Sequence, residues 1–579
     1  MQLNGARILI ECLIREGVNI IFGYPGGSVL DIYDELPQYG EQLRHVLVRH
    51  EQAAVHAALR DRVGCAAVAV HAADGYARAT GKVGVCMATS GPGATNTVTG
   101  IATAYCDSIP MVIFTGQVPT GLIGNDAFQE VDIAGITRPC TKHNYVVKDV
   151  KDLAKVVRQA FYLARSGRPG PVLVDLPKNV LQGSAEFVWP EDVSLRSYNP
   201  TYRPNYAQIR KVVDALYNAE RPLLFGGGGV IMSNASEEFR NLAKNLSIPV
   251  TCSLMGLGAF PCDHPQWLGM LGMHGTYAAN KAVSNADLLI AVGVRFDDRV
   301  TGRLSSFAPK ATIVHIDIDP TSIHKNVNVR IPVVGDCRNS LVAIREHLAA
   351  REPLPWKERF AAWQGQLDEW KQEQPITWTP GETTIKPQEV IKAVDKITEG
   401  KAILTTEVGQ HQMWAAQLYN FTEPRTLLTS GGLGTMGYGF PAAIGAQFAY
   451  PNKLVIDVSG DGSFQMNLQE LITAVSNKLP VKVLLLNNGC LGMVRQLQDL
   501  FYGGRLNAVD IPDQPDFVKL AEAYGAEGYR VAKLEDLEST LRTAFASPNT
   551  AIIDVIVERD ENVYPTVPSG ASLDEMLLL

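Results

Sequence analysis

The sequence predicts an α/β protein built from three doubly wound parallel sheets. Short apolar runs alternate with helix-like stretches along almost the whole chain, and this alternation is typical of parallel strands covered by helices. The length of 579 residues suits three domains of ordinary size. Two polar motifs near the C-terminal end each follow an apolar run, which is where open α/β sheets bind their ligands.

The first predicted domain covers residues 1–190. Its expected strands are the apolar runs 20–22, 46–48, 83–88, 111–115 and 171–176. The second domain, 191–345, begins with a linker, because residues 191–205 contain prolines and lack hydrophobic periodicity. Its expected strands are 222–225, 249–252, 288–292 and 313–318.

A charged connection leads to the third domain. Residues 346–385 are rich in tryptophan and proline, and we expect them to be partly helical. The third domain, 386–579, has expected strands at 402–405, 454–458, 481–486 and 552–557. A tail follows from Glu561.

Composition excludes several classes of function. A net charge of −8 gives no basic surface for nucleic acid or for an anionic membrane. The nine cysteines form no CxxC pair, which argues against a zinc site or a disulfide framework. No uncharged apolar run is long enough to cross a bilayer, and no secretory signal is recognisable. We therefore expect a cytoplasmic enzyme with no nucleic-acid or membrane partner.

The two C-terminal motifs predict a site for a metal and a diphosphate. Gly460-Asp461-Gly462-Ser463 follows the run 453–458, and Asn487-Asn488 follows the run 481–486. Asp461 and Asn488 offer a carboxylate and an amide oxygen, which suit Mg²⁺ held together with substrate phosphates. The glycines let the backbone approach a diphosphate closely. The alternative is two surface turns, since Asp-Gly and Asn-Gly are ordinary turn dipeptides.

The first domain carries further segments with chemistry. Gly23–Gly27 ends its first strand, and Ser90–Asn96 ends a later strand and opens a helix. Such Gly-rich turns receive anions or a close cofactor ring, although each is more often only a tight turn. Glu51 lies between them, and a lone glutamate at a helix start is usually a cap favoured by the helix dipole.

The paired C-terminal motifs resemble the thiamine diphosphate (ThDP) signature, which implies Asp461, Asn488 and the Cys490 carbonyl as metal ligands. Nearly the whole chain is similar, in order, to acetohydroxyacid synthase catalytic subunits. The segments that carry this resemblance are Gly23–Gly27, Arg49–Gln52, Asp74–Gly81, Thr89–Asn96, Gly124–Glu130, Ser166–Pro171, Met270–Thr276, Gly293–Gly302, His315–Asp319, Glu407–Trp414, Gly431–Ala443 and Ser569–Met576.

The resemblance implies a pyrimidine-binding domain, a central FAD domain and a diphosphate domain. It implies ThDP-dependent decarboxylation of pyruvate and carboligation to a second 2-keto acid, pyruvate or 2-ketobutyrate. The products are 2-acetolactate and 2-aceto-2-hydroxybutyrate, which belong to valine, leucine and isoleucine biosynthesis. The family works as a homodimer with active sites at the subunit boundary and commonly binds a small regulatory subunit. ThDP, Mg²⁺ and FAD are the implied cofactors.

Site residues carry over by position. Glu51 matches the catalytic glutamate, which bonds the aminopyrimidine ring. The implied ThDP contacts are Gln410 and His411 at the diphosphate, Met436 beneath the two rings, and Gly462 and Ser463 in the metal motif. The implied FAD contacts are Arg168, Met273, His274, Gly275, Thr276, Arg295, Asp317 and Asp319. The implied substrate pocket comprises Gly27, Phe128, Gln129, Met273, Arg299, Met493 and Leu497.

Arg299 matches the residue that binds the second substrate's carboxylate, a role that suits a guanidinium. From the residues alone, a salt bridge with Asp297 or Asp298 is the simpler interpretation. Two other functions also stay open. The pyruvate oxidases share the three-domain plan and use the flavin for redox chemistry, although RFDDRVTG and GASLDEM favour the synthase. The second alternative is a catalytically impaired homologue that only binds cofactors or a regulatory subunit.

The first departure from the family pattern is an insertion of 15 residues, 56–70. AVHAA occurs at 54–58 and again at 69–73, as in an imperfect tandem duplication. Only the first copy carries Glu51, because the equivalent position in the second copy is Ala66. We expect Asp61–Gly64 to break the helix, part of the segment to loop out, and the fold to survive.

The second departure is Leu497, which stands where the family has a tryptophan over the second-substrate pocket. Leucine keeps the site apolar but removes a flat aromatic wall. Since such a wall contributes discrimination of only a few kcal/mol, we predict weak preference for 2-ketobutyrate. Insensitivity to herbicidal inhibitors that contact this tryptophan follows for the same reason.

Overall fold

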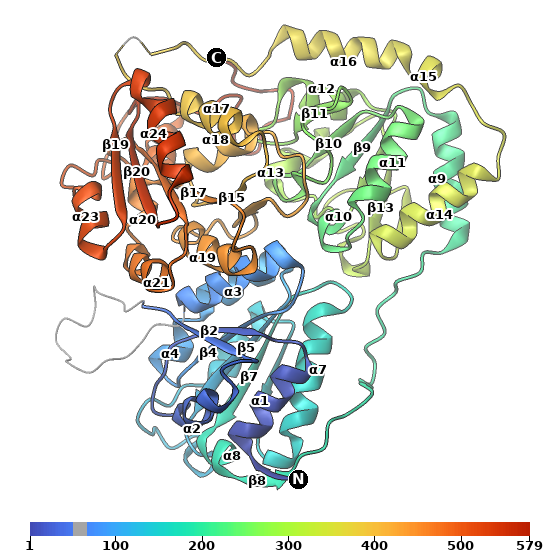
Figure 1. Cartoon of the computed structure of the whole chain (residues 1–579). Coiled ribbons are helices and arrows are strands. Elements are labelled where there is room, and N and C mark those ends of the chain that lie inside the picture. Colours follow the sequence, from blue (N-terminus) through green and yellow to red (C-terminus); the bar gives the residue numbers. More distant parts are fainter. Residues whose placement is uncertain (50–66, 382) are drawn as a thin grey trace.

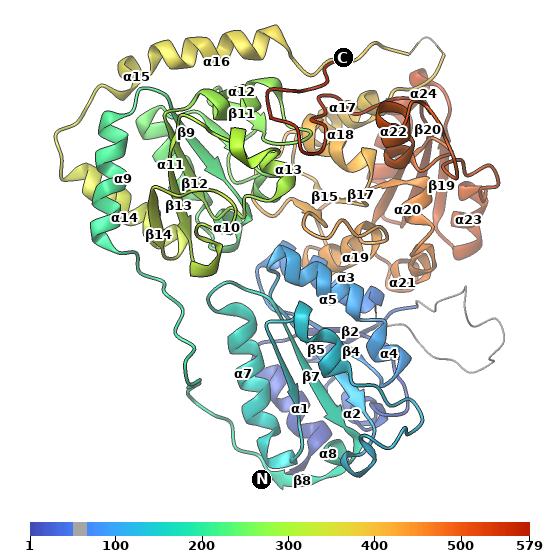
Figure 2. The same cartoon turned by 180° about the vertical axis from the view of Figure 1, so that it is seen from behind.

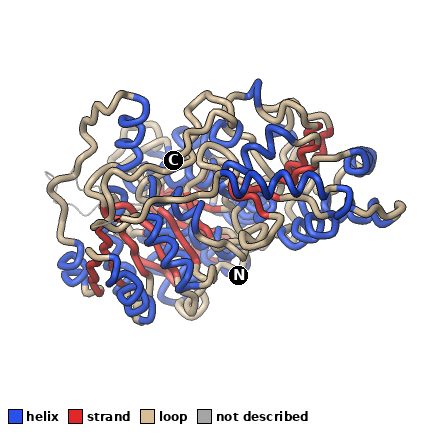
Figure 3. Tube along the Cα trace, turned by 90° about the horizontal axis from the view of Figure 1, so that it is seen from above, coloured by secondary structure: helices blue, strands red, loops and turns tan. Residues whose placement is uncertain are grey.

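Three six-stranded sheets, each parallel throughout, form the framework of the chain (Figure 1). The computed structural model describes residues 1–49, 67–381 and 383–579. Helices surround the strands, as the view from above shows (Figure 3). The prediction of three doubly wound parallel sheets is confirmed.

The N-terminal sheet has the strand order β3-β2-β4-β5-β7-β6. Its strands are β2 (Ile20–Gly23), β3 (Arg44–Leu47), β4 (Gly84–Ala88), β5 (Met111–Gln117), β6 (His143–Val146) and β7 (Pro171–Pro177). The covering helices include α1 (Gly5–Arg15), α2 (Leu30–Glu35), α3 (Ala67–Thr80), α5 (Val98–Asp107) and α7 (Leu153–Arg165). A short antiparallel pair, β1 (Gln2–Asn4) and β8 (Ser184–Glu186), joins the two ends of this part of the chain.

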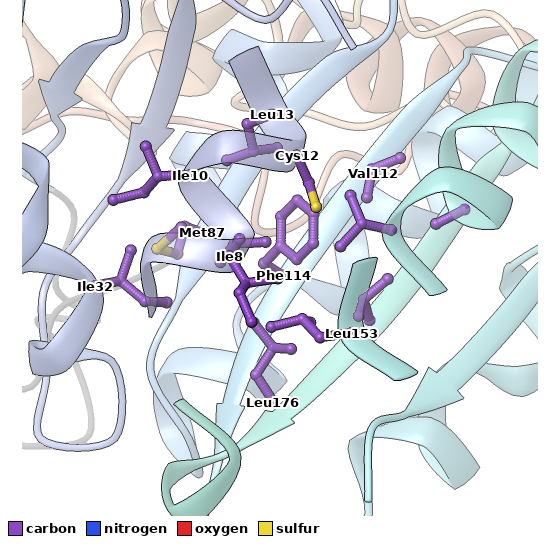
Figure 4. Close-up of a cluster of buried hydrophobic side chains, with 14 of the residues drawn as sticks. Ile8, Ile10, Cys12, Leu13, Ile32, Met87, Val112, Phe114, Leu153 and Leu176 are labelled. Atoms are coloured by element: carbon purple, nitrogen blue, oxygen red, sulfur yellow. The ribbon is translucent and has the colours of Figure 1, made fainter. Parts of the chain in front are cut away.

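Helix α1 shows how an amphipathic pattern fixes one layer of this core. The Asn4 side chain accepts a hydrogen bond from the Arg7 N–H and caps the helix. Leu13 and its apolar neighbours then face the sheet, where Phe114 of β5 is completely buried (Figure 4). The helix is therefore held by burial of its apolar face.

The middle sheet has the order β11-β10-β9-β12-β13-β14. Its strands are β9 (Pro222–Gly226), β10 (Val250–Cys252), β11 (Trp267–Met270), β12 (Leu288–Val292), β13 (Thr312–Asp317) and β14 (Ile331–Val334). The principal helices are α9 (Tyr206–Asn218), α11 (Ser236–Leu246), α12 (Tyr277–Asn285) and α14 (Cys337–Ala349). In chain order this is 3-2-1-4-5-6, the arrangement typical of dinucleotide-binding sheets.

The C-terminal sheet has the order β16-β15-β17-β18-β20-β19. Its strands are β15 (Ile403–Thr406), β16 (Leu427–Thr429), β17 (Val455–Gly460), β18 (Lys482–Asn487), β19 (Glu527–Val531) and β20 (Ala551–Ile556). The principal helices are α17 (Pro387–Thr398), α18 (Gln410–Leu418), α19 (Gly439–Ala449), α22 (Gly492–Phe501), α23 (Phe517–Tyr524) and α24 (Leu534–Ala546). Numbered along the chain, this order equals that of the N-terminal sheet.

Strand prediction found every interior strand of the three sheets but, of their edge strands, only β3. Every predicted strand exists, with ends that differ by a few residues. The prediction missed β6, β11, β14, β16 and β19, all of which are edge strands. An edge strand pairs on one side only and is partly exposed, so runs such as HNYV and EGYRV show no continuous apolar signal.

Two connections lead from one sheet to the next. Residues 191–205 form neither helix nor strand and run alongside the molecule to α9 (Figures 1 and 2). Residues 346–385 contain α15 (Trp356–Arg359) and α16 (Ala361–Glu373), so this connection is partly helical. Trp363 and Leu367 anchor α16 on the middle domain.

Close packing of α3 against α19 joins the N-terminal and C-terminal domains (Figure 2). A Cβ on Gly445 would lie 1.9 Å from the Ala72 carbonyl oxygen, so only glycine allows this approach. Beside it, the buried Arg78 guanidinium bonds Asp74 at 2.5 Å and Asp107 at 3.0 Å. The Tyr438 hydroxyl donates to Asp74 at 2.7 Å and the Gly431 N–H donates to Asp107 at 3.1 Å, which fixes the loop before α19 against the N-terminal domain.

Among the described residues, no helix is both long and apolar enough to cross a membrane. The eight cysteines in this part of the chain are all free.

Candidate functional site

Two of the three predicted metal ligands lie together at the carboxyl edge of the C-terminal sheet. Asp461 directly follows β17, and Asn488 directly follows the neighbouring β18. The Asn488 backbone N–H and the Gln514 side-chain amide both donate to the Asp461 carboxylate. Cys490, the third predicted ligand through its carbonyl, donates its N–H to the Asn488 side chain at 3.2 Å.

Burial disfavours the ionised form of the Asp461 carboxyl group. It raises the pKa of the carboxyl to about 6, although the surrounding hydrogen bonds lower it. A divalent cation at this point would favour the ionised form. Within the described ranges, no three His, Cys, Asp or Glu side chains gather as a metal cluster. The candidate set is therefore one carboxylate with amide and backbone oxygens, which suits Mg²⁺.

Two glycines without side chains allow Gln410 and His411 to lie close to the predicted metal ligands. A Cβ on Gly460 would lie 2.9 Å from His411 Nδ1. A Cβ on Gly492 would lie 2.2 Å from Gln410 Oε1 and 2.8 Å from Asn488 Nδ2. All of these groups meet where the strand order reverses between β15 and β17, which is the usual ligand position of such sheets.

Gln410 and His411 each have one polar side-chain atom without a hydrogen-bond partner among the described residues. Gln410 Oε1 and His411 Nε2 are buried and have no hydrogen-bond partner among the described residues. Burial lowers the pKa of His411 to about 4, while a bond from its ring to the Glu407 carbonyl opposes this shift. Because buried polar groups are normally paired, these atoms point to a polar ligand. The set fits a metal-bound diphosphate.

The remaining C-terminal candidates surround this point. Met436 is half-buried on the loop between β16 and α19. Gly462 is close-packed, since a Cβ there would lie 2.9 Å from Leu491, and Ser463 donates to the Gly460 carbonyl at 3.2 Å.

On α22, Met493 packs against the core of the C-terminal domain. Leu497 follows one turn later and is 43% exposed. The two side chains therefore share one face of the helix, as a common pocket requires.

A different set of residues lies where the N-terminal sheet reverses its strand order, between β2 and β4. Ser28 Oγ lies 2.9 Å from Thr89 Oγ1 and accepts the Ser90 N–H at 2.9 Å. A Cβ on Gly91 would lie 2.9 Å from Gln129, so the Gln129 loop covers the same crevice.

The predicted substrate residues around this crevice are placed differently from one another. Gly27 stands exposed at its mouth. Phe128 projects away from the chain and is 88% exposed. The structure therefore brings Gly27 and Gln129 to one edge but leaves Phe128 without a packing partner among the described residues.

Arg299 and Met273 are brought together. Arg299 Nη1 lies 3.3 Å from Met273 Sδ, and the Met273 N–H donates to the Arg299 carbonyl at 2.7 Å. The alternative salt bridge with Asp298 is long, 3.6 Å, and both side chains are well exposed. Such a pair contributes little, and most of the guanidinium stays accessible.

The middle sheet reverses its order between β9 and β12, and glycines line that crevice. A Cβ on Gly227 would lie 2.2 Å from the Gly293 carbonyl oxygen. Asp297 Oδ1 and His315 Nδ1 are buried there and lack a partner in the part of the chain described. Close backbone approach with unused polar atoms fits a dinucleotide such as FAD.

Most of the predicted FAD residues border this crevice. Arg168 Nη1 donates to Asp319 Oδ2 at 3.1 Å, and Arg295 Nη2 donates to Asp297 at 2.9 Å. Asp317 accepts the Asp319 N–H at 2.8 Å.

The segment Met273–Thr276 follows β11. There the His274 ring faces the Pro565 carbonyl and Thr566 of the C-terminal tail. Together with Thr276, His274 lines a cavity of about 230 Å³ between the middle and C-terminal domains. The His274 side chain is thus directed at the tail, whereas the segment's backbone lies beside the sheet.

Glu51 and the expected break at 61–64 lie outside the described residues. Arg49, at the end of the preceding segment, donates its N–H to Glu470 at 2.7 Å. Helix α3 begins at Ala67, and the second AVHAA copy, 69–73, packs into the domain core.

One feature of this region escaped sequence reasoning. Glu407 follows β15 and is completely buried. It accepts the Gly437 N–H at 2.5 Å and the Phe440 N–H at 3.2 Å. The signal available was an acidic residue at the end of an apolar strand, the same signal that drew attention to Asp461.

Comparisons with known proteins agree with this geometry. Models of the thiamine pyrophosphate enzyme domains match the N-terminal domain at residues 3–61 and 66–136, the central domain at 209–344 and the C-terminal domain at 407–555. The N-terminal match is interrupted inside the inserted segment.

The chain is also similar over its full length to curated proteins. The acetolactate synthase isozyme 3 large subunit of Escherichia coli is 50% identical and covers 100% of this chain and 99% of its own. An acetolactate synthase large subunit of Haemophilus influenzae is 49% identical, over 100% and 98%. An acetolactate synthase of Mycobacterium leprae is 49% identical, over 99% and 90%.

Proposed function

Because this chain belongs to the thiamine pyrophosphate enzymes, in the family of acetolactate synthase large subunits, we propose that it is an acetolactate synthase. It decarboxylates pyruvate and joins the remaining two-carbon unit to pyruvate or 2-ketobutyrate. The products serve branched-chain amino acid biosynthesis. The observation that carries this proposal is the convergence of Gln410, His411, Asp461 and Asn488 at one reversal point.

Three cofactors belong to the proposal. ThDP, when bound, supplies the electron sink for decarboxylation. Mg²⁺ is assigned to Asp461, Asn488 and the Cys490 carbonyl, supported by the oxygen-only donor set and by the buried carboxyl. FAD is assigned to the middle domain, supported by its strand order and by the glycine-lined crevice.

The chain's own groups then have distinct tasks. His411 holds a diphosphate oxygen through Nε2, which has no partner among the described residues and donates once the negative diphosphate favours the protonated ring. Gln410 lies beside it at the same crevice and helps to hold the diphosphate. Met436 supports the cofactor rings from its loop. Arg299 holds the carboxylate of the second substrate with its accessible guanidinium. Glu51 bonds the aminopyrimidine ring and holds its proton.

The assembly we propose is a homodimer that shares its active sites and binds a small regulatory subunit. The exposed Phe128, Leu433 and Phe501 supply apolar surface for a subunit boundary. The printed name of the Escherichia coli relative, a large subunit, supports a smaller partner. We propose a cytoplasmic enzyme with domains 1–190, 191–345 and 386–579, joined by the connection 346–385.

A colorimetric acetoin assay on the purified protein tests this function. With pyruvate, ThDP, Mg²⁺ and FAD, acetolactate should form, and omission of ThDP or Mg²⁺ should abolish it. Omission of FAD should lower activity without any change in product. Reduction of an added electron acceptor without acetolactate would instead identify a pyruvate oxidase. ThDP binding without carbon dioxide release would identify an impaired homologue.

A further inference from the structure

Glu407 connects two of the candidate cofactor residues and has no role so far in the proposed reaction. It lies at the carboxyl end of β15, three residues before the start of α18. Its carboxyl oxygens accept the N–H groups of Gly437, which directly follows Met436, and of Phe440 in the first turn of α19. Its backbone carbonyl accepts a hydrogen bond from the His411 ring.

The turn that Glu407 holds is fixed from two sides. Gly437 has a positive φ of 83°, donates its N–H to Glu407 and accepts a bond from the Asn467 amide at its carbonyl. A Cβ on Gly439 would lie 2.6 Å from the Glu407 nitrogen and 2.4 Å from Asp457 Oδ1. The chain between Met436 and α19 therefore lies directly against the Glu407 carboxylate.

A purely structural carboxylate rarely occupies such a place. Both Glu407 and the neighbouring Asp457 are completely buried, and neither forms an ion pair with any described residue. Burial, followed by the proximity of Asp457, raises the pKa of Glu407 well above its ordinary range. Groups kept at this electrostatic cost cluster at functional sites.

We propose that Glu407 is a positioning residue for ThDP. It sets both the position of Met436 and the orientation of the His411 ring. This rests on the proposed function. A single residue thereby couples the support of the cofactor rings, through its side chain, to the orientation of the diphosphate-binding His411, through its backbone carbonyl. Loss of its carboxyl group should loosen the Met436 turn directly and the His411 ring through the freed Glu407 backbone, even though Glu407 itself does not contact the cofactor.

The test measures ThDP binding by titration calorimetry at saturating Mg²⁺, with no substrate present. Glu407→Gln keeps the side-chain volume but replaces one acceptor oxygen by a donor, so one of the two N–H bonds is lost. We expect the dissociation constant for ThDP to rise about tenfold, as for other groups that orient ligand-binding residues. Glu407→Asp, which retains the carboxyl group but is shorter, should fall between this variant and the parent.

Glu35→Gln is the matched control. Glu35 is a buried carboxylate of the N-terminal domain that accepts bonds from Asn4, Arg7 and Gln38. Its loss should lower thermal stability without any effect on ThDP affinity. Near-UV circular dichroism of the bound cofactor should change for Glu407→Gln only.

The outcomes separate this inference from the proposed function. Parent protein that binds no ThDP would overturn the function itself. Parent protein that binds ThDP, with Glu407→Gln within twofold of it, would overturn the positioning role alone. An equal loss of affinity in Glu35→Gln would do the same, because affinity would then follow stability. Should Glu407→Gln not fold, parent-like binding by Glu407→Asp is the contradicting result.

Discussion

The N-terminal and C-terminal sheets have the same strand order, yet their reversal points carry different chemistry. In the C-terminal domain, the crevice between β15 and β17 holds a buried carboxyl group and polar atoms of Gln410 and His411 that lack a partner in the described part of the chain. In the N-terminal domain, the equivalent crevice holds Ser28 and Thr89, whose hydroxyls bond each other. Topology decides where a ligand can bind, and the loop residues decide which ligand it is.

The largest expected difference between the two crevices concerns charge. Asp461→Asn keeps the shape but removes the negative charge offered to Mg²⁺. We expect activity at standard Mg²⁺ to fall at least about 100-fold, which exceeds the typical loss for groups that only orient metal ligands. The measurement is the acetolactate rate as a function of Mg²⁺ concentration.

Ser28→Ala is the counterpart in the N-terminal crevice. It should lower thermal stability by about 1 kcal/mol through lost hydrogen bonds and leave the Mg²⁺ dependence unchanged. Equal shifts in Mg²⁺ dependence for both variants would contradict the division of chemistry between the two domains.

The next effect concerns specificity at the C-terminal crevice. Leu497→Trp restores an aromatic wall, and we expect it to raise the preference for 2-ketobutyrate over pyruvate about tenfold. Product ratios from mixed substrates measure this. Leu534→Trp is the control, since Leu534 is a similarly exposed leucine, 46% against 43%, in α24. A parent enzyme that already favours acetohydroxybutyrate strongly would refute the prediction.

The buried carboxyl group of Asp457 in the C-terminal domain should also make the stability of the protein depend on pH. Burial raises the pKa of Asp457 from 3.8 to about 7. Between these two pH values the folded state keeps a proton that the unfolded state has released. Its contribution to stability is therefore complete below pH 3.8 and is lost as the pH rises toward 7. The loss is at most about 1.4 kcal/mol per pH unit.

Asp457→Asn should flatten this dependence between pH 5 and 7, although Glu407 beside it retains part of the slope. The Thr405 and Ser459 hydroxyls that now donate to Asp457 can accept from the new amide. Melting temperatures across this range measure the effect. Parallel curves for parent and variant would show that Asp457 is ionised throughout.

The smallest expected effect comes from deletion of residues 56–70 in the N-terminal domain. The deletion places Ala54-Val55 where Ala69-Val70 now pack, so the buried residues stay identical. We expect the melting temperature to stay within about 4 °C of the parent. A deletion variant that cannot fold would contradict this, whereas large gains in activity and stability would show that the insertion is damaging.

Sequence reasoning recovered the interior strands because both faces of a central parallel strand are buried and read as apolar runs. It missed edge strands such as β6 and β19, whose exposed positions carry polar residues. It could not anticipate that Gly445 allows α3 and α19 to touch, because such contacts depend on residues far apart in the chain.

Within the site, Asp461 and Asn488 were predictable because each directly follows a strand of one sheet. The hydrogen bond between them was not, since it depends on strand register. Glu407 was missed for a related reason. Its role depends on the Gly437–Phe440 turn, which lies 30 residues further along the chain.

The central claim is that a divalent cation bound by Asp461 and Asn488 anchors the ThDP diphosphate. Anomalous diffraction from crystals grown with Mn²⁺ and ThDP tests it most directly. We predict one strong manganese peak per protomer between the Asp461 carboxylate and the Asn488 side chain, in contact with diphosphate density. Manganese located elsewhere, or ThDP bound with no metal at this crevice, would contradict the assignment.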